Sequence, residues 1–403
     1  MRSQCQHMMA AFKARLKTFE DLLGADKIDR GKLRKECYQG CPENNCRALC
    51  WKLLLNYLPL QRSEWEKEKA KQRAAYRNFI QELIIIPGQK AKSNLSANGT
   101  LADHPLNPNP DSQWQEDFKD NDMLMQIDKD CRRLCPDLFF FQRATEFPCE
   151  ELVKAGSNVE TLRKRVEHSV LKSETVARNR QGITVNRSNS RRKSEDYIAL
   201  KEGEEAHWEV VERILFIYAK LNPGLNYVQG MNEILGPIYY TFATDHDDDC
   251  RTNAEADSFF CFTNLMAEIR DSFIKSLDES QCGIGYSMEL LYRKLREQDV
   301  ALWHRLEEVE LKPQFFAFRW LTLMLSQEFP LPDVLRIWDS LFADANRFDF
   351  LIYICMAMLV LVRNEILTSD FPSIMKLVQN FPHNRIDIHT VLAKATELSF
   401  RQS

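Results

Sequence analysis

Glycine is scarce in this sequence of 403 residues, and it contains no apolar run long enough to cross a membrane. The chain has 13 glycines, whereas average usage of about 7% would give about 28. Its longest apolar run, residues 350–362, is 13 residues long, and a membrane-spanning helix needs about 20. We therefore expect residues 350–362 to form a buried core helix. The low glycine content favours a helical protein.

Sequence signatures of several enzyme classes are also missing. There is no Gly-x-x-x-x-Gly-Lys-Ser/Thr loop to hold phosphates, so we expect that the chain does not hydrolyse a nucleotide by itself. Neither a Gly-x-Ser-x-Gly nor a His-Glu-x-x-His motif occurs. The formal net charge of −4 gives no global reason to bind nucleic acid or an anionic membrane. We predict no bound cofactor and no nucleic-acid partner.

The twelve cysteines do not form a familiar metal-binding pattern. Residues 1–7 lack the apolar segment of a secretory signal, so we expect a cytoplasmic chain with reduced thiols. Cys37, Cys41, Cys46 and Cys50 are separated by three, four and three residues, unlike the two-residue spacing of most zinc sites. We predict no metal site here, and interpret Cys46 and Cys50 as small buried residues of one helix.

Apolar residues recur at helical spacing along most of the chain, and no strand alternation of comparable length competes. We predict an all-α protein. Its expected parts are an N-terminal amphipathic helix and lead-in (residues 1–32), one multi-helical domain (33–395) and a tail (396–403). The predicted helices span residues 10–23, 46–58, 65–83, 226–235, 258–274, 288–298, 301–309, 314–326, 333–342, 348–365 and 373–380, with others ending near Arg133 and at Asn222.

Two irregular insertions interrupt the predicted domain. Residues 87–111 are rich in Gly, Ser, Asn, Asp and Pro and have no helical period. The second insertion spans about 147–205, and its residues 163–193 hold ten Lys or Arg against two Glu. Because this composition buries little apolar surface, we predict a mobile loop, either merely solvated or in peripheral contact with anionic lipid. Ser194 follows three basic residues and is a candidate phosphorylation site.

Arg133 stands at the end of a predicted helix. Ile127 lies on the apolar stripe of that helix, and Pro136 disfavours helical geometry at the residue before it. Asp130 lies three residues before Arg133 and is its neighbour on the helix surface, so its carboxylate can orient the guanidinium. A plainer interpretation is that Arg133 only complements the helix dipole.

Gln229 is the second oriented polar side chain. A helix-breaking Asn-Pro-Gly sequence ends at Gly224, and we predict that a new helix starts at Asn226. Its spacing places Val228 and Met231 on an apolar face and Gln229 on a polar one. The alternative is a capping box, in which Asn226 caps the helix and Gln229 reaches back to it, worth about 1 kcal/mol.

Arginine and glutamine are the side chains that a small GTPase lacks or holds poorly. Arginine stabilises charge that develops on the phosphate oxygens, and glutamine orients the attacking water. The residues do resemble a known family at this point. Arg47-Ala-Leu-Cys-Trp51, Ile127-Asp-Lys-Asp-Cys-Arg-Arg133 and Tyr227-Val-Gln-Gly-Met-Asn232 are similar to the three ordered signature motifs of the TBC domain, and residues 333–339 resemble a further family segment.

This resemblance implies an all-helical GTPase-activating protein for a Rab-type small GTPase, acting in vesicle trafficking with a dual-finger mechanism. Arg133 would be the arginine finger, and Gln229 would replace the glutamine of the Rab. Asp130, Tyr227 and Asn232 would support them, whereas Arg47, Trp51 and Ile127 would be structural. GTP and Mg²⁺ would belong to the partner, which would bring the cytoplasmic chain to intracellular membranes.

Two positions depart from the family pattern. Leu-Cys-Pro follows Arg133 where Thr-x-Pro is common, and Asn226 precedes Tyr227 where glycine is frequent. In addition, about 60 residues separate the flanking helices of the two motifs. Because both finger residues are present, this insertion bears on the choice of Rab more than on catalysis. The competing hypothesis is an adaptor of the same fold that binds a Rab without accelerating hydrolysis.

Overall fold

The computed structural model describes residues 2–42, 46–84, 113–153, 161–168, 200–201, 203–274, 283–347 and 349–400. Their regular structure is helical, and the only strand-like pairings within these ranges are two isolated bridges, Lys27 with Gln61 and Ala144 with Ala206. The predicted all-α class is confirmed. None of the helices in these ranges is long and apolar enough to cross a membrane.

The chain divides into two compact units, which are described separately. Unit 1 consists of Met1–Gln72 and Glu233–Ser403, and unit 2 of Arg73–Asn232. Two helices begin in one unit and end in the other: α4 (Trp65–Leu83) and α10 (Met231–Ala243). The helix α4 has the bounds that the sequence predicts.

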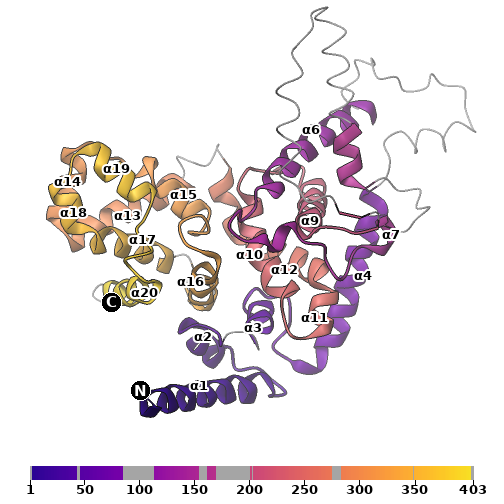
Figure 1. Ribbon diagram of the computed structural model, residues 1–403, viewed down its shortest axis with the longest axis horizontal. Coiled ribbons are helices and arrows are strands. Elements are labelled where there is room, and N and C mark those ends of the chain that lie inside the picture. The colour runs from indigo at the N-terminus through magenta and orange to yellow at the C-terminus, as the bar shows by residue number, and fades with distance from the viewer. Residues whose placement is uncertain are drawn as a thin grey trace, which may run out of the picture. The chain divides into compact units, whose positions relative to one another are not determined.

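Unit 2 is built around two packed helices, α6 (Gln113–Arg132) and α9 (His207–Leu221) (Figure 1). The apolar stripe of α6 is buried, with Ile127 fully so, and α9 is buried along most of its length. The short helices η2 (Phe139–Gln142) and α7 (Glu150–Val153) lie between them in sequence, and η2 contacts α9. This packing fixes the C-terminal end of α6.

Unit 1 holds the remaining helices. In it, α16 packs on α2 and α3, and α17 packs on α20. The expected core helix is confirmed, because α17 is buried over most of its length. The helices of unit 1 are α1 (Arg2–Leu23), α2 (Arg30–Tyr38), α3 (Arg47–Leu54), η1 (Arg62–Glu64), α11 (Asp248–Thr252), α12 (Ala254–Ile269), η4 (Arg270–Phe273), α13 (Ile284–Gln298), α14 (Val300–Glu308), η6 (Pro313–Phe315), α15 (Ala317–Thr322), α16 (Leu331–Ala343), α17 (Asp349–Leu361), α18 (Arg363–Thr368), α19 (Phe371–Gln379) and α20 (Ile388–Phe400).

Several predicted helix boundaries were wrong, because single residues leave helical geometry inside a periodic sequence. The predicted helix 46–58 stops at Leu54, and Asn56 then has a φ of +57°. The predicted helix 314–326 is shortened to α15, after which Met324 and Leu325 both have positive φ. The predicted helix 348–365 is split into α17 and α18 at Val362. Sequence periodicity also missed α2, α11 and α20.

Some predictions lie outside the described residues. These are the loop 87–111, most of the basic insertion at about 147–205, and Ser194 within it. The C-terminal helix α20 runs through residue 396 to Phe400, and Leu398 is buried in unit 1.

Candidate functional site

Two consecutive arginines at the end of α6 have different environments. Arg132 is the last residue of the helix; its Nε donates to Asp128 at 2.8 Å, and its guanidinium lies 4.5 Å from the centre of the Trp208 ring. Arg133 follows the helix, and 61% of its side chain is exposed. Its Nη2 forms an ion pair with the buried carboxylate of Asp130. Arg132 is therefore packed into the unit, whereas Arg133 is held at one end and presented to solvent.

The chain turns sharply after α6. Cys135 has a φ of +43° and precedes Pro136, so the helix cannot continue, as the sequence predicts. The Nε2 of Gln142 donates to the carbonyl oxygen of Arg132 at 3.0 Å, which gives one of the last helical carbonyls a partner. The end of α6 is thus fixed by local sequence and by η2.

Asp130 joins α6 to the segment that carries Gln229. One of its carboxylate oxygens forms the ion pair with Arg133, and the other accepts a hydrogen bond from the Tyr227 hydroxyl at 2.7 Å. The Nδ2 of Asn232 donates to the Asp130 backbone carbonyl at 3.2 Å. The four residues of this cluster lie in unit 2, although about 100 positions separate its two halves in sequence.

The segment before α10 is not the helix that the sequence predicts. The helix begins at Met231, and Asn226 and Gly230 have φ values of +61° and +102°. The Asn226 side chain accepts from the Tyr227 N–H at 2.7 Å, which is not the bond of a capping residue. The capping-box alternative for Gln229 is therefore wrong. Gln229 is exposed in a turn and forms no hydrogen bond within the described part of the chain.

The left-handed geometry of Asn226 explains one departure from the family pattern. A φ of +61° suits glycine, which is frequent at this position in the family, and asparagine is among the few other residues that adopt it readily. The substitution therefore preserves the backbone path that leads from Asn226 to Gln229.

A buried acid close to this cluster was missed by sequence reasoning. Glu212, on α9, is 1% exposed, and within the described ranges neither of its carboxylate oxygens has a hydrogen-bond partner. Burial raises the pKa of Glu212 well above its usual value, and the charges of Asp128 and Glu209 raise it further, against the opposing effect of Arg132. Its only signal in the sequence was its place in a mostly apolar helix, after Val210 and Val211 and before the apolar run 214–219. We infer that Glu212 keeps its proton to a higher pH than an exposed glutamate does.

Replacing Glu212 by glutamine is expected to stabilise the protein increasingly as the pH rises above about 4.3. Because the pKa of Glu212 is raised, the folded state keeps a proton that the unfolded chain releases above about pH 4.3. The native chain therefore loses stability as the pH rises from about 4.3 toward the raised pKa of the folded state. The glutamine variant lacks this loss, which amounts to up to about 1.4 kcal/mol per pH unit. Thermal unfolding between pH 5 and 8 checks it, with the exposed Glu82→Gln as control. If the melting temperatures of Glu212→Gln and the native chain change with pH in parallel, the pKa of Glu212 is not raised.

The first signature motif forms a separate polar cluster in unit 1. The carboxylate of Asp339, on α16, is fully buried and accepts from Arg47 Nε at 3.1 Å and from Trp51 Nε1 at 2.8 Å. The Cys41 backbone N–H also donates to it, at 2.8 Å. Arg47 and Trp51 thus attach α3 to α16, which is a structural arrangement.

Comparison with known proteins places this architecture in a family. Residues 165–367 match the model of the Rab-GTPase-TBC domain. TBC1 domain family member 13 of Mus musculus is 58% identical over 400 residues, covering 97% of this chain and 99% of that protein. A TBC domain-containing protein of Schizosaccharomyces pombe is 36% identical over 453 residues, covering 96% of this chain and 73% of that protein.

The fold agrees with these sequence matches. The crystal structure of the Ypt/Rab-GAP domain of Gyp1p superimposes on this chain with a TM-score of 0.66, at 20% identity, covering 97% of this chain and 98% of that one. The chain belongs to the Rab-GTPase-TBC domain family, as its three motifs predict.

Proposed function

We propose that this protein is a GTPase-activating protein for a Rab small GTPase, supplying Arg133 and Gln229 in trans. The observation that carries the proposal is the Asp130 cluster. One buried carboxylate holds the exposed arginine through one oxygen and, through the other, the tyrosine two positions before the exposed glutamine. An arginine that only complemented the helix dipole would not need this second connection.

The chemistry assigned to the two side chains is complementary. Arg133 neutralises charge on the phosphate oxygens as the transferred phosphoryl group forms, and it carries a fork of donors in a fixed plane. Gln229 both donates and accepts, so its amide orients the attacking water. GTP and Mg²⁺ are carried by the Rab, and this chain binds neither by itself.

The exposed position of both side chains favours action on a partner. Arg133 keeps 61% of its side chain accessible although its carboxylate partner is 4% exposed, and the adjacent Arg132 is only 18% exposed. Holding a side chain through one nitrogen of its guanidinium while the rest stays accessible reduces the entropy lost when the guanidinium meets a ligand. Tyr227 and Asn232 act as positioning residues, because both donate hydrogen bonds to Asp130.

The Gln229 role is tested with a Rab whose own catalytic glutamine is replaced by alanine. The native chain is expected to accelerate GTP hydrolysis by this Rab variant nearly as well as by the unchanged Rab, whereas Gln229→Ala loses most of the acceleration. Single-turnover phosphate release measures both, with Gln126→Ala, an exposed glutamine of α6, as control. If the Rab variant is insensitive to the native chain, Gln229 does not position water.

A panel of Rab proteins distinguishes activation from mere binding. Substoichiometric amounts of the chain are expected to accelerate hydrolysis by at least one member, because an activator turns over. Binding without acceleration across the whole panel would support the alternative of a catalytically silent adaptor.

A further inference from the structure

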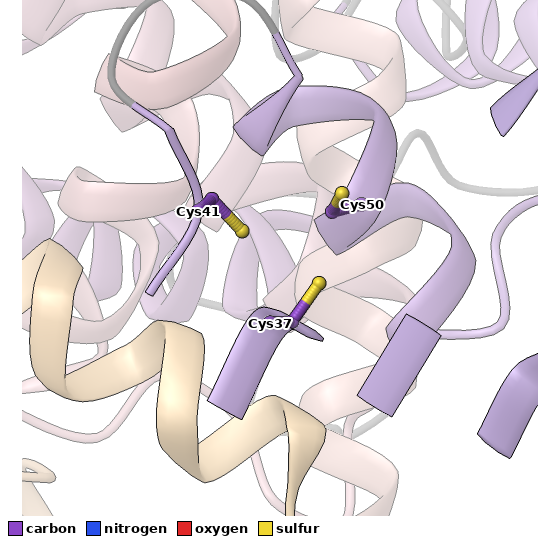
Figure 2. Close-up of side chains that lie close together, drawn as sticks. All are labelled: Cys37, Cys41 and Cys50. Carbon is purple, nitrogen blue, oxygen red and sulfur yellow. The ribbon is translucent and has the colours of Figure 1, made fainter. Parts of the chain in front are cut away.

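Three cysteine side chains converge in unit 1. The sulfur atoms of Cys37, Cys41 and Cys50 all lie within 4.8 Å of one another, and all three residues are buried. Figure 2 shows them on the end of α2, on the loop that follows it, and on α3, with their sulfur atoms gathered together. The spacing along the sequence did not predict this arrangement, which the fold creates.

The backbone around these thiols is held in place independently of the sulfur atoms. Gly40 has a φ of +96°, and a Cβ there would come within 2.7 Å of the Arg336 side chain, so the turn before Cys41 requires glycine. The Gly40 N–H donates to the Cys37 carbonyl at 2.8 Å, and the Cys41 N–H donates to Asp339. The three thiols are therefore positioned together by a fixed turn and two helices.

Cys46 is the fourth cysteine of this part of the sequence. Cys46 precedes α3 directly, is 5% exposed, and lies one helical turn before Cys50, whose N–H donates to its carbonyl at 2.9 Å. The Cys46 sulfur is not one of the three that lie mutually within 4.8 Å. The four cysteines form a C-x₃-C-x₄-C-x₃-C sequence; most zinc sites have two-residue spacings, but three and four intervening residues also occur in structural zinc sites.

The surroundings offset negative charge on sulfur. Arg15 donates through Nη2 to the Gly40 carbonyl at 2.5 Å, and Arg336 lies against the same turn. The nearby carboxylate of Asp339 is already occupied by Arg47, Trp51 and the Cys41 N–H, so its oxygens do not compete with the thiols for a cation. A set of four thiolates with a divalent ion carries two negative charges, which two guanidinium groups balance.

We propose that Cys37, Cys41, Cys46 and Cys50 bind one structural zinc ion that ties α2 to α3. Zinc binds four thiolates tetrahedrally with Zn–S distances of about 2.3 Å, which places the sulfur atoms about 3.8 Å apart. The sulfur atoms of Cys37, Cys41 and Cys50 lie within 4.8 Å of one another, so each of these three moves by less than about 1 Å on binding, and the Cys46 side chain turns to supply the fourth ligand. Binding releases the thiol protons to solvent and changes no oxidation state. The proposal is independent of GTPase activation.

Burial favours zinc over an oxidation-sensitive thiol pair. Cysteines that respond to oxidants need solvent access, and Cys37 and Cys50 are both 0% exposed. A closed site with four protein ligands and no open position is instead typical of structural zinc.

The test measures zinc in the full-length chain, purified without a histidine tag from medium that contains zinc. Mass spectrometry of the metal is expected to find about one zinc per chain, and Cys37→Ala and Cys50→Ala to reduce it at least about tenfold. Cys355→Ala, another fully buried cysteine of unit 1, is the matched control and keeps its zinc. Cobalt in place of zinc is expected to give thiolate charge-transfer absorption.

Three outcomes would overturn the proposal. The first is a native chain that is purified without zinc and whose melting temperature does not rise when Zn²⁺ is added. The second is an equal loss of zinc in Cys355→Ala and Cys37→Ala. The third is a disulfide between two of these cysteines in the purified native chain. Cys46→Ala is expected to lose zinc to a chelator at least about tenfold faster than the native chain. An unchanged rate would remove Cys46 from the ligand set.

Discussion

Replacing Arg133 by alanine is expected to lower the acceleration of Rab GTP hydrolysis by about 10³- to 10⁵-fold, which is the contribution of an arginine supplied in trans. The loss arises in the transition state, where charge accumulates on phosphate oxygens. Single-turnover hydrolysis with the most responsive Rab of the panel measures it. Because Arg133 is 61% exposed, the variant should still fold, with some loss of thermal stability because the buried Asp130 carboxylate loses its ion-pair partner.

Two further variants separate the arginine fork from simple positive charge. Arg133→Lys keeps the charge but loses the planar pair of donors, so we expect it to recover only a small part of the activity. Lys129→Ala removes an exposed cation from the same helix and is expected to leave activity unchanged. If Arg133→Ala retains the native rate, the exposed guanidinium is only a feature of the helix end.

Replacing Asp339 by alanine is expected to destabilise unit 1 by about 3–5 kcal/mol. The change leaves Arg47 without its buried anion, and it leaves the Trp51 indole N–H and the Cys41 backbone N–H buried without a hydrogen-bond acceptor. The loss exceeds that of most single substitutions because one carboxylate serves three groups. Denaturation in urea, followed by the tryptophan fluorescence of the chain, measures it.

A smaller change in the same cluster is expected to cause a smaller loss in the free energy of unfolding. Trp51→Phe removes one hydrogen bond while keeping an aromatic ring, and should cost about 1–3 kcal/mol. Glu289→Ala, which removes an exposed carboxylate on α13, is the control and should cost less than about 0.5 kcal/mol. An Asp339→Ala loss no larger than this control would show that the cluster contributes little to stability.

Features that depend on neighbouring residues could be predicted from the amino-acid sequence. Helical spacing gave the all-α class and the bounds of α4, and Pro136 set the end of α6. The pairing of Asp130 with Arg133 was also predictable, because residues three apart on a helix are neighbours whatever surrounds them. The buried α17 followed from its continuous apolar run.

Features that depend on residues far apart in the chain became visible only in the folded protein. Asp130 meets Tyr227 across 97 positions, and Asp339 meets Arg47 across 292, distances over which periodicity carries no information. The left-handed residues before α10 delayed its start to Met231, because hydrogen bonds and packing outweighed helical spacing there. The convergence of Cys37, Cys41 and Cys50 likewise arises from the turn at Gly40 and the packing of α2 on α3, since sequence spacing fixes neither.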